Sequence, residues 1–498
     1  MSKFRQIILI MTDTQRWDML GCYAQTGLQT PNLDRLASEG MRFERAYNCQ
    51  PVCGPARSAM FTGLFPHSNG SWANSIALSS NVKTIGQRML EAGFTTCFIG
   101  KWHLDGSDYF GLGRAPDGWD AAYWYDMRNY LEELNETDRR KSRRVETMNL
   151  GSLSADFTFG HRCSNRAIDF LTEHASEDFF LVLSCDEPHH PYLCPEPFSK
   201  MYRDFRFPKS RNVWDRLESK PDHQKVWAGT RLTEDKDRLE INMPFYFGCN
   251  SFIDSEIGRV LEAIDRLTPE CMVIYTSDHG DMLESHSLTN KGPFMYDEVT
   301  RIPFIIRWPG KVSHGITNSH LVSHIDIVPT ILDAAGLPQP NWLEGISLLP
   351  TLEDPSKCIH DVVFMEFGRY EIDHDPFAGF QPIRSIFDGR WKLVINLLTS
   401  DELYDLENDP EEMINLIEFR GSQPERDRLH NRLIEWMNTT RDPFRGYYWE
   451  RRPWRSDAQP ASWAHTGMTR QRENDADEPR QLDYATGVQM DRAVRPIH

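Results

Sequence analysis

Short apolar runs alternate with longer amphipathic stretches over the first two-thirds of the chain. Runs that are almost free of polar residues are typical of strands buried on both faces of a parallel sheet. They occupy Ile7–Met11, Thr95–Ile99, Phe179–Ser184 and Met272–Thr276. Helical patterns lie between them, at Pro31–Glu39, Val82–Ala92 and Asn250–Leu267. The alternation predicts an α/β fold with a large mixed, mostly parallel sheet sandwiched by helices.

The pattern changes near residue 355, where the turn residues Glu353-Asp354-Pro355-Ser356 mark a boundary. We expect an α/β catalytic domain over residues 1–355 and a smaller α+β subdomain over 356–498, with an antiparallel sheet, a helix and an extended tail. Its expected strands and helix are Val362–Phe367, Ile383–Phe387, Trp391–Ile395 and Pro424–Met437. Two stretches rich in charged and aromatic residues interrupt the first domain, and we interpret them as insertions that shape a substrate entrance. They are Tyr125–Arg144 and Arg203–Lys236.

Polar side chains follow several of the predicted strands. Asp13 comes after the first strand, Asp186 follows the third, and Ser277-Asp278-His279-Gly280 follows the last. Ligands and reacting groups of open α/β sheets gather at the carboxyl ends of the strands. We therefore expect the active site at this edge.

Charge and cysteine usage narrow the function. The net charge of −18 argues against nucleic-acid binding, which needs clustered cations, so an anionic substrate requires a local cationic pocket. The apolar run Ile7–Met11 is too short for a signal peptide or a membrane span. The ten cysteines form no CxxC pair, which favours a reduced, cytoplasmic setting, or a periplasmic one if a leader has been removed. The sequence leaves the oligomeric state open.

Four short motifs carry the chemistry. They are Cys53-Gly54-Pro55-Ala56-Arg57, Gly100-Lys101-Trp102-His103, Pro188-His189-His190-Pro191 and Lys291-Gly292. The first resembles the C-x-P-x-R signature of the type I, formylglycine-dependent sulfatases of the alkaline phosphatase superfamily, and the others resemble later segments of that family. The matches span Ile7 to about Leu416. The resemblance implies an alkaline-phosphatase-like fold and the hydrolysis of sulfate esters.

The resemblance also implies a mechanism. A maturase oxidises Cys53 to formylglycine, whose hydrated form uses one hydroxyl to attack sulfur and the other to expel the product. The implied roles are charge neutralisation by Lys101 and Lys291, orientation of the diol by Arg57, protonation of the leaving alcohol by His189 and removal of the remaining hydroxyl proton by His103. Asn74 and His190 are candidates for substrate binding.

A divalent metal completes the implied site, with Asp13, Asp278, His279 and the modified Cys53 as ligands. The family usually has two adjacent acids after the first strand, whereas this chain has Thr14 after Asp13. The resemblance puts Ca²⁺ first, and the mixed ligand set leaves Mn²⁺, Mg²⁺ and Zn²⁺ open.

The expected substrate is a small sulfate ester, and the aromatic insertions favour a carbohydrate because sugars stack on rings. The partners are then this substrate and the maturase, with no nucleic acid and no membrane. Two alternatives remain. One is a phosphodiesterase or phosphonate monoester hydrolase of the same superfamily, and the other is a non-catalytic binder of sulfated glycans.

Overall fold

The computed structural model describes the whole chain except residues 1–4, 107–108, 151–152, 372–378, 456–486 and 488–498. Its centre is an eight-stranded sheet in the order β4-β3-β5-β1-β6-β7-β2-β8. The strands are β1 (Gln6–Thr12), β2 (Met41–Tyr47), β3 (Thr95–Gly100), β4 (Trp124–Tyr125), β5 (Phe179–Ser184), β6 (Met272–Ser277), β7 (Arg301–Arg307) and β8 (Ile316–Ser323). Within the described chain only β7 runs antiparallel to its neighbours, so the predicted mixed, mostly parallel sheet is confirmed.

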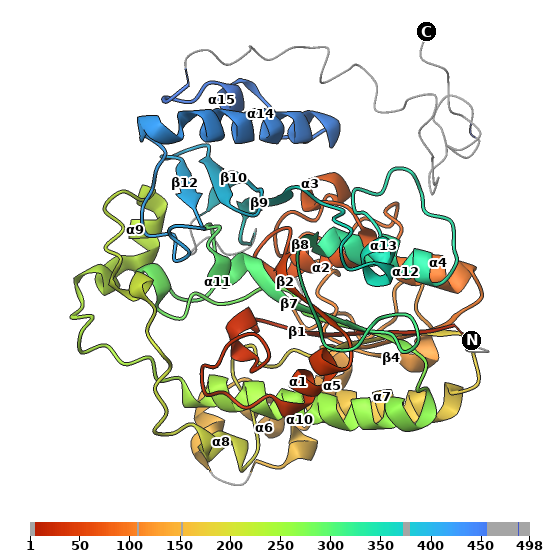
Figure 1. The fold of residues 1–498 in the computed structure, drawn as a ribbon. Coiled ribbons are helices and arrows are strands. Elements are labelled where there is room, and N and C mark those ends of the chain that lie inside the picture. The colour runs from red at the N-terminus through yellow and green to blue at the C-terminus, as the bar shows by residue number, and fades with distance from the viewer. Residues whose placement is uncertain (1–4, 107–108, 151–152, 372–378, 456–486, 488–498) are drawn as a thin grey trace.

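Helices cover both faces of this sheet (Figure 1). One layer contains α1 (Pro31–Ser38), α5 (Met127–Glu133), α7 (Phe159–His174) and α10 (Pro244–Leu267). The other contains α2 (Cys53–Thr62), α4 (Ile85–Glu91), α12 (Ile327–Ala334) and α13 (Leu349–Glu353). Each layer packs its apolar face on the sheet in a separate core cluster. The three predicted helices are present, although α10 begins six residues before the expected start.

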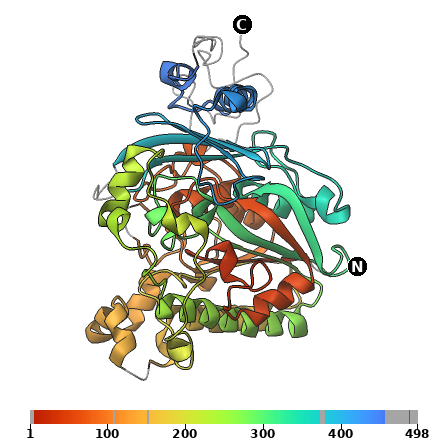
Figure 2. The ribbon, with the colours of Figure 1, turned by 60° about the vertical axis from the view of Figure 1, so that its left-hand side comes forward.

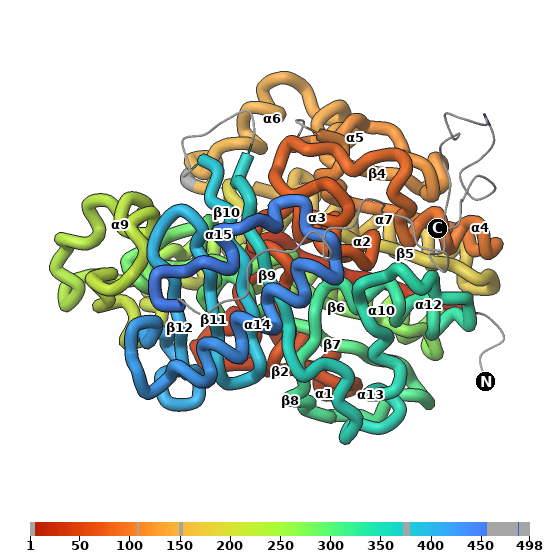
Figure 3. Tube along the Cα trace, turned by 90° about the horizontal axis from the view of Figure 1, so that it is seen from above, coloured from red at the N-terminus to blue at the C-terminus, as the bar shows by residue number. Residues whose placement is uncertain are grey.

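A second, four-stranded antiparallel sheet lies above the first (Figure 2). It contains β9 (Val363–Arg369), β10 (Phe380–Phe387), β11 (Trp391–Asn396) and β12 (Glu402–Asp405). The helix α14 (Gln423–Thr439) runs across these strands when the molecule is seen from above (Figure 3). The predicted strands and helix of the C-terminal unit are thus confirmed. The expected tail beyond residue 455 lies almost wholly outside the described residues.

The small sheet shares its core with the large unit. Cys49, Phe65 and Ile325 of the first unit pack in one cluster with residues of β11 and α14. The boundary at residue 355 falls between α13 and β9, and the division into two domains stays a prediction. None of the described helices combines the length and the apolar character that crossing a membrane requires.

Candidate active site

The two central strands deliver the acidic residues of the site. β1 and β6 are parallel neighbours, and their register pairs Thr12 with Ser277. The residues that follow, Asp13 and Asp278, must therefore lie side by side at the carboxyl edge of the sheet. Both carboxylates are fully buried. The placement predicted from the strand ends is confirmed for this pair.

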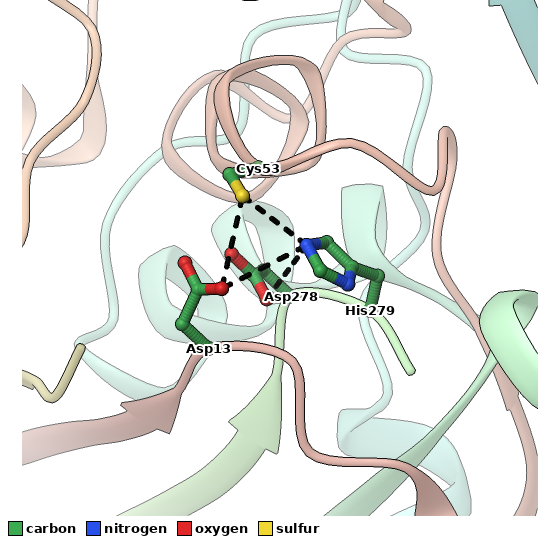
Figure 4. Close-up of side chains that lie close together, drawn as sticks. All are labelled: Asp13, Cys53, Asp278 and His279. Atoms are coloured by element: carbon green, nitrogen blue, oxygen red, sulfur yellow. Dashed lines mark hydrogen bonds and ion pairs between the residues drawn. The ribbon is translucent and has the colours of Figure 1, made fainter. Parts of the chain in front are cut away.

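Cys53 faces these acids from the first position of α2 (Figure 4). Its Sγ lies 3.7 Å from Asp13 Oδ1 and 3.2 Å from His279 Nε2. Asp13, Cys53, Asp278 and His279 each offer a ligand atom, and these atoms all lie within 4.8 Å of one another. The structure thus brings together the four residues that were expected to hold a metal.

Arg57, one turn further along α2, is fully buried and joins the two carboxylates. Its Nη2 donates to Asp13 at 3.0 Å and its Nε donates to Asp278 at 3.1 Å. Its Nη1 donates to the carbonyl oxygen of Lys101 at 2.7 Å. The guanidinium therefore fixes both acids relative to the helix that carries residue 53.

The two expected lysines lie in different electrostatic surroundings. Lys101 Nζ, just after β3, is 2.8 Å from Asp13 and 3.0 Å from Asp186. Lys291 Nζ instead contacts Cys53 Sγ at 3.2 Å and Thr14 Oγ1 at 3.4 Å. Lys101 thus belongs to a buried ion network, whereas Lys291 points at the reacting residue.

These cations act on the thiol of Cys53. Burial and the Asp13 carboxylate raise its pKa, but Lys291, Lys101 and His279 outweigh them and hold the pKa well below its usual value. The site therefore stabilises negative charge at residue 53.

The remaining predicted residues surround the same point. His103 is buried with a backbone φ of 59°, and the amide oxygen of Asn74 accepts a hydrogen bond from the Gly54 N–H at 2.9 Å. His189 Nδ1 lies 3.1 Å from the hydroxyl of Tyr109, and His190 is exposed at the rim. Asn74 therefore supports the turn at the start of α2.

A cavity of about 190 Å³ opens beside Lys291. Its lining includes His189 and His190, which were predicted, and several residues that the sequence interpretation did not assign to the site. The lining residues are Thr14, His189, His190, Tyr192, Trp227, Asp281, Asn290, Lys291 and Tyr370. Trp227 comes from the predicted insertion Arg203–Lys236, which therefore does contribute to the pocket wall.

Asp186 and Tyr109 are further site residues, of which the sequence interpretation noted Asp186 at a strand end without a role and did not identify Tyr109. Asp186 is buried and pairs with Lys101, and Tyr109 donates to Asp186 at 2.7 Å. Asp186 follows β5 much as Asp13 follows β1, and that strand-end position was the available signal. Tyr109 follows no strand and carried no such signal.

The mixed sheet with its two helical layers, and the buried acids, imidazole and cations at its carboxyl edge, define a protein of the alkaline-phosphatase-like fold. The chain belongs to the sulfatase family, because the sulfatase family model matches residues 5–337. A second model, described as the C-terminal part of N-sulphoglucosamine sulphohydrolase, matches residues 285–439. The chain is therefore a sulfuric ester hydrolase, and the identification made from its motifs is confirmed.

A curated relative agrees with the family, and solved structures share the fold. An uncharacterised sulfatase, YidJ of Escherichia coli K12, is 45% identical over 491 residues, which cover 97% of this chain and 96% of the relative. A solved structure in complex with its substrate D-glucosamine-2-N,6-O-disulfate has a TM-score of 0.73 at 23% identity and covers 89% of this chain and 99% of its own. The phosphonate monoester hydrolase of Agrobacterium radiobacter has a TM-score of 0.71 at 23% identity and covers 88% and 96%.

Proposed function

We propose that the enzyme cleaves a sulfate ester of a carbohydrate with a formylglycine made from Cys53. The main support is the position of residue 53. It is the first residue of α2 and lies between the carboxylates at the ends of β1 and β6 and the ammonium of Lys291. A hydrated aldehyde at this position supplies one hydroxyl that attacks sulfur and a second that expels the sulfate.

The residues present fit one divalent metal ion. Asp13, Asp278 and His279 present two carboxylates and one imidazole, all buried, beside the side chain of residue 53. Oxygen and nitrogen donors of this kind suit Mn²⁺ and Zn²⁺, and the carboxylates also suit Ca²⁺ and Mg²⁺. A bound ion would withdraw charge from the oxygens of residue 53 and of the substrate. The family resemblance makes Ca²⁺ the first ion to test.

Protein side chains perform the remaining steps. Lys291 contacts residue 53, so we assign a sulfate oxygen of the substrate to it as well, and Lys101 adds positive charge beside Asp13. His189 Nδ1 is held by Tyr109 and by the carbonyl oxygen of His190 at 2.9 Å, so we assign its Nε2 to the departing alcohol. We assign removal of the second hydroxyl proton to His103.

Mass spectrometry tests the modification directly. In a host that supplies a maturase, trypsin releases residues 46–57, which contain both Cys49 and Cys53. Alkylation should label Cys49 and leave position 53 as an aldehyde. Because both cysteines lie in one peptide, an alkylated Cys49 shows that the alkylation of this peptide was complete. Alkylation of both residues would contradict the proposal and favour a non-catalytic binder.

Kinetics then test the substrate class. We expect kcat/KM for 4-nitrophenyl sulfate and for sulfated monosaccharides to exceed that for a phosphodiester or a phosphonate monoester. Thr14 at the position of the family's second acid, and the structural likeness to a phosphonate monoester hydrolase, make this comparison necessary. A phosphodiester preferred by orders of magnitude would overturn the sulfate assignment.

We also place the enzyme in the cytoplasm, because all ten cysteines are unpaired. Fractionation of the native host tests this, and recovery from the periplasm would contradict it.

A further inference from the structure

The pocket beside residue 53 contains a carboxylate that binding of a sulfate does not need. Asp281 is 6% exposed and lines the cavity together with Lys291 and Thr14. Its Oδ1 accepts a hydrogen bond from the Leu283 N–H at 2.8 Å. In the described chain no lysine, arginine or histidine lies within ion-pair distance of it. The N–H of Met282 donates to the carbonyl of Asn290 at 2.9 Å, which holds this segment beside the one that carries Lys291.

Aromatic rings form another part of the wall. Trp227 and Tyr370, which directly follows β9, lie with ring centroids 6.5 Å apart and planes at 36°. The indole Nε1 donates to the carbonyl of Thr289 at 3.0 Å, which fixes the ring. Aromatic faces of this kind bind the apolar face of a sugar or an ammonium group.

The size of the cavity limits its occupant. The described residues enclose about 190 Å³, below the roughly 300 Å³ at which sites for drug-sized ligands begin. The space therefore suits one sugar ring.

We propose that this pocket binds the leaving group and that Asp281 selects a monosulfated sugar ring bearing hydroxyl or ammonium donors. A second sulfate or carboxylate on the ring would meet the unpaired charge of Asp281 and be repelled. Hydroxyl and ammonium groups would instead donate to it. This assignment rests on the proposed function and adds the substrate class.

The test compares three substrates in the wild-type enzyme and in Asp281→Asn. Galactose 6-sulfate offers hydroxyls, glucosamine 6-sulfate adds an amine, and glucosamine-2-N,6-O-disulfate adds a second anion. We expect wild-type kcat/KM for the disulfate to be lower than for both monosulfates by about tenfold or more. Asp281→Asn should remove most of this preference, because asparagine keeps an acceptor for the Leu283 N–H but carries no charge.

A matched control variant separates the effect of the charge at position 281 from the effect of the net charge of the protein. Asp222→Asn, at an exposed residue of the insertion Arg203–Lys236, changes the net charge equally and should leave the preference unchanged. A second measurement needs no variant at position 281. Galactose and glucosamine should inhibit the wild-type enzyme, whereas glucosamine 2-N-sulfate should inhibit at least about tenfold more weakly.

Equal wild-type rates for mono- and disulfate, or an unchanged preference in Asp281→Asn, would overturn the role of Asp281 while sulfatase activity persists. Absence of sulfate release from every ester, including 4-nitrophenyl sulfate, would instead refute the proposed function, and this assignment would fall with it.

Discussion

Replacing the two site lysines by methionine should separate charge that serves catalysis from charge that stabilises the fold. Methionine retains most of the side-chain volume, so the comparison isolates the ammonium. Lys291 contacts Cys53 and Thr14, and no carboxylate of the described chain lies within ion-pair distance of it. Lys291→Met should therefore lower kcat/KM by about 10²–10³, the loss typical of one electrostatic donor to a developing negative charge. Its unfolding free energy should stay within about 1 kcal/mol of wild type, because no buried acid loses its partner.

Lys101→Met should behave differently. Lys101 lies 2.8 Å from Asp13 and 3.0 Å from Asp186, and all three side chains are buried. Removing one partner of a buried ion pair costs about 3–5 kcal/mol, because the remaining charge stays buried without compensation. This variant should therefore lose stability as well as activity.

Urea unfolding measures the stability of both variants, and hydrolysis of 4-nitrophenyl sulfate measures their activity. The unfolding is done with a chelator present, so that a bound cation does not compensate Asp13. The reasoning is refuted if Lys291→Met unfolds as early as Lys101→Met, or if Lys291→Met keeps kcat/KM within about threefold of wild type.

Three further changes probe the same molecule. His189→Gln should slow sugar sulfates by about 10²-fold or more and nitrophenyl sulfate much less, because only the poor leaving group needs the proton; equal losses in kcat/KM would exclude His189 as the acid. Arg57→Lys should lower the metal content per chain measured by elemental analysis, since lysine cannot donate to Asp13 and Asp278 together as the fork of arginine does; undiminished metal would contradict this. Burial lowers the pKa of His430 to about 4, so its neutral form stabilises the fold above about pH 6.5 and this contribution is lost as the pH falls towards 4. In urea unfolding, the difference in unfolding free energy between wild type and His430→Gln should shrink over that pH range. A constant difference would show that His430 does not titrate as described.

The strands that the sequence predicts are the central ones. β1, β5 and β6 are buried on both faces, so their sequences are almost purely apolar and give an unambiguous pattern. β2, β4, β7 and β8 were not predicted. β4 and β8 are edge strands, β2 lies beside β8, and β7 contains Pro303, a residue that argues against a strand inside a sheet. The sequence of β2, MRFERAY, alternates charged and apolar residues, and β8, ITNSHLVS, is polar except at Ile316, Leu321 and Val322. Polar residues on such strands hide the signal.

The site likewise contains residues whose positions the sequence predicts and residues whose positions it does not. The approach of Asp13 to Asp278 could be predicted, because both follow strands and parallel strands end at one edge. Trp227 reaches the pocket from the helix α9 (Asp222–Ala228), Asp281 from the loop after β6, and Tyr370 from the end of β9 in the C-terminal unit. Their meeting depends on how distant segments pack, and no local spacing encodes that contact.

Thr14 shows how one departure from the family pattern affects the whole site. Its hydroxyl donates to Asp13 Oδ1 at 2.8 Å and accepts from Lys291 at 3.4 Å. Its backbone φ of 62° is unusual for a β-branched residue, and its N–H reaches Asp278 at 3.2 Å. A carboxylate here would form an ion pair with Lys291 and compete with the substrate for it. The threonine instead positions the acids without adding charge, so the Lys291 ammonium stays available for an anion at residue 53.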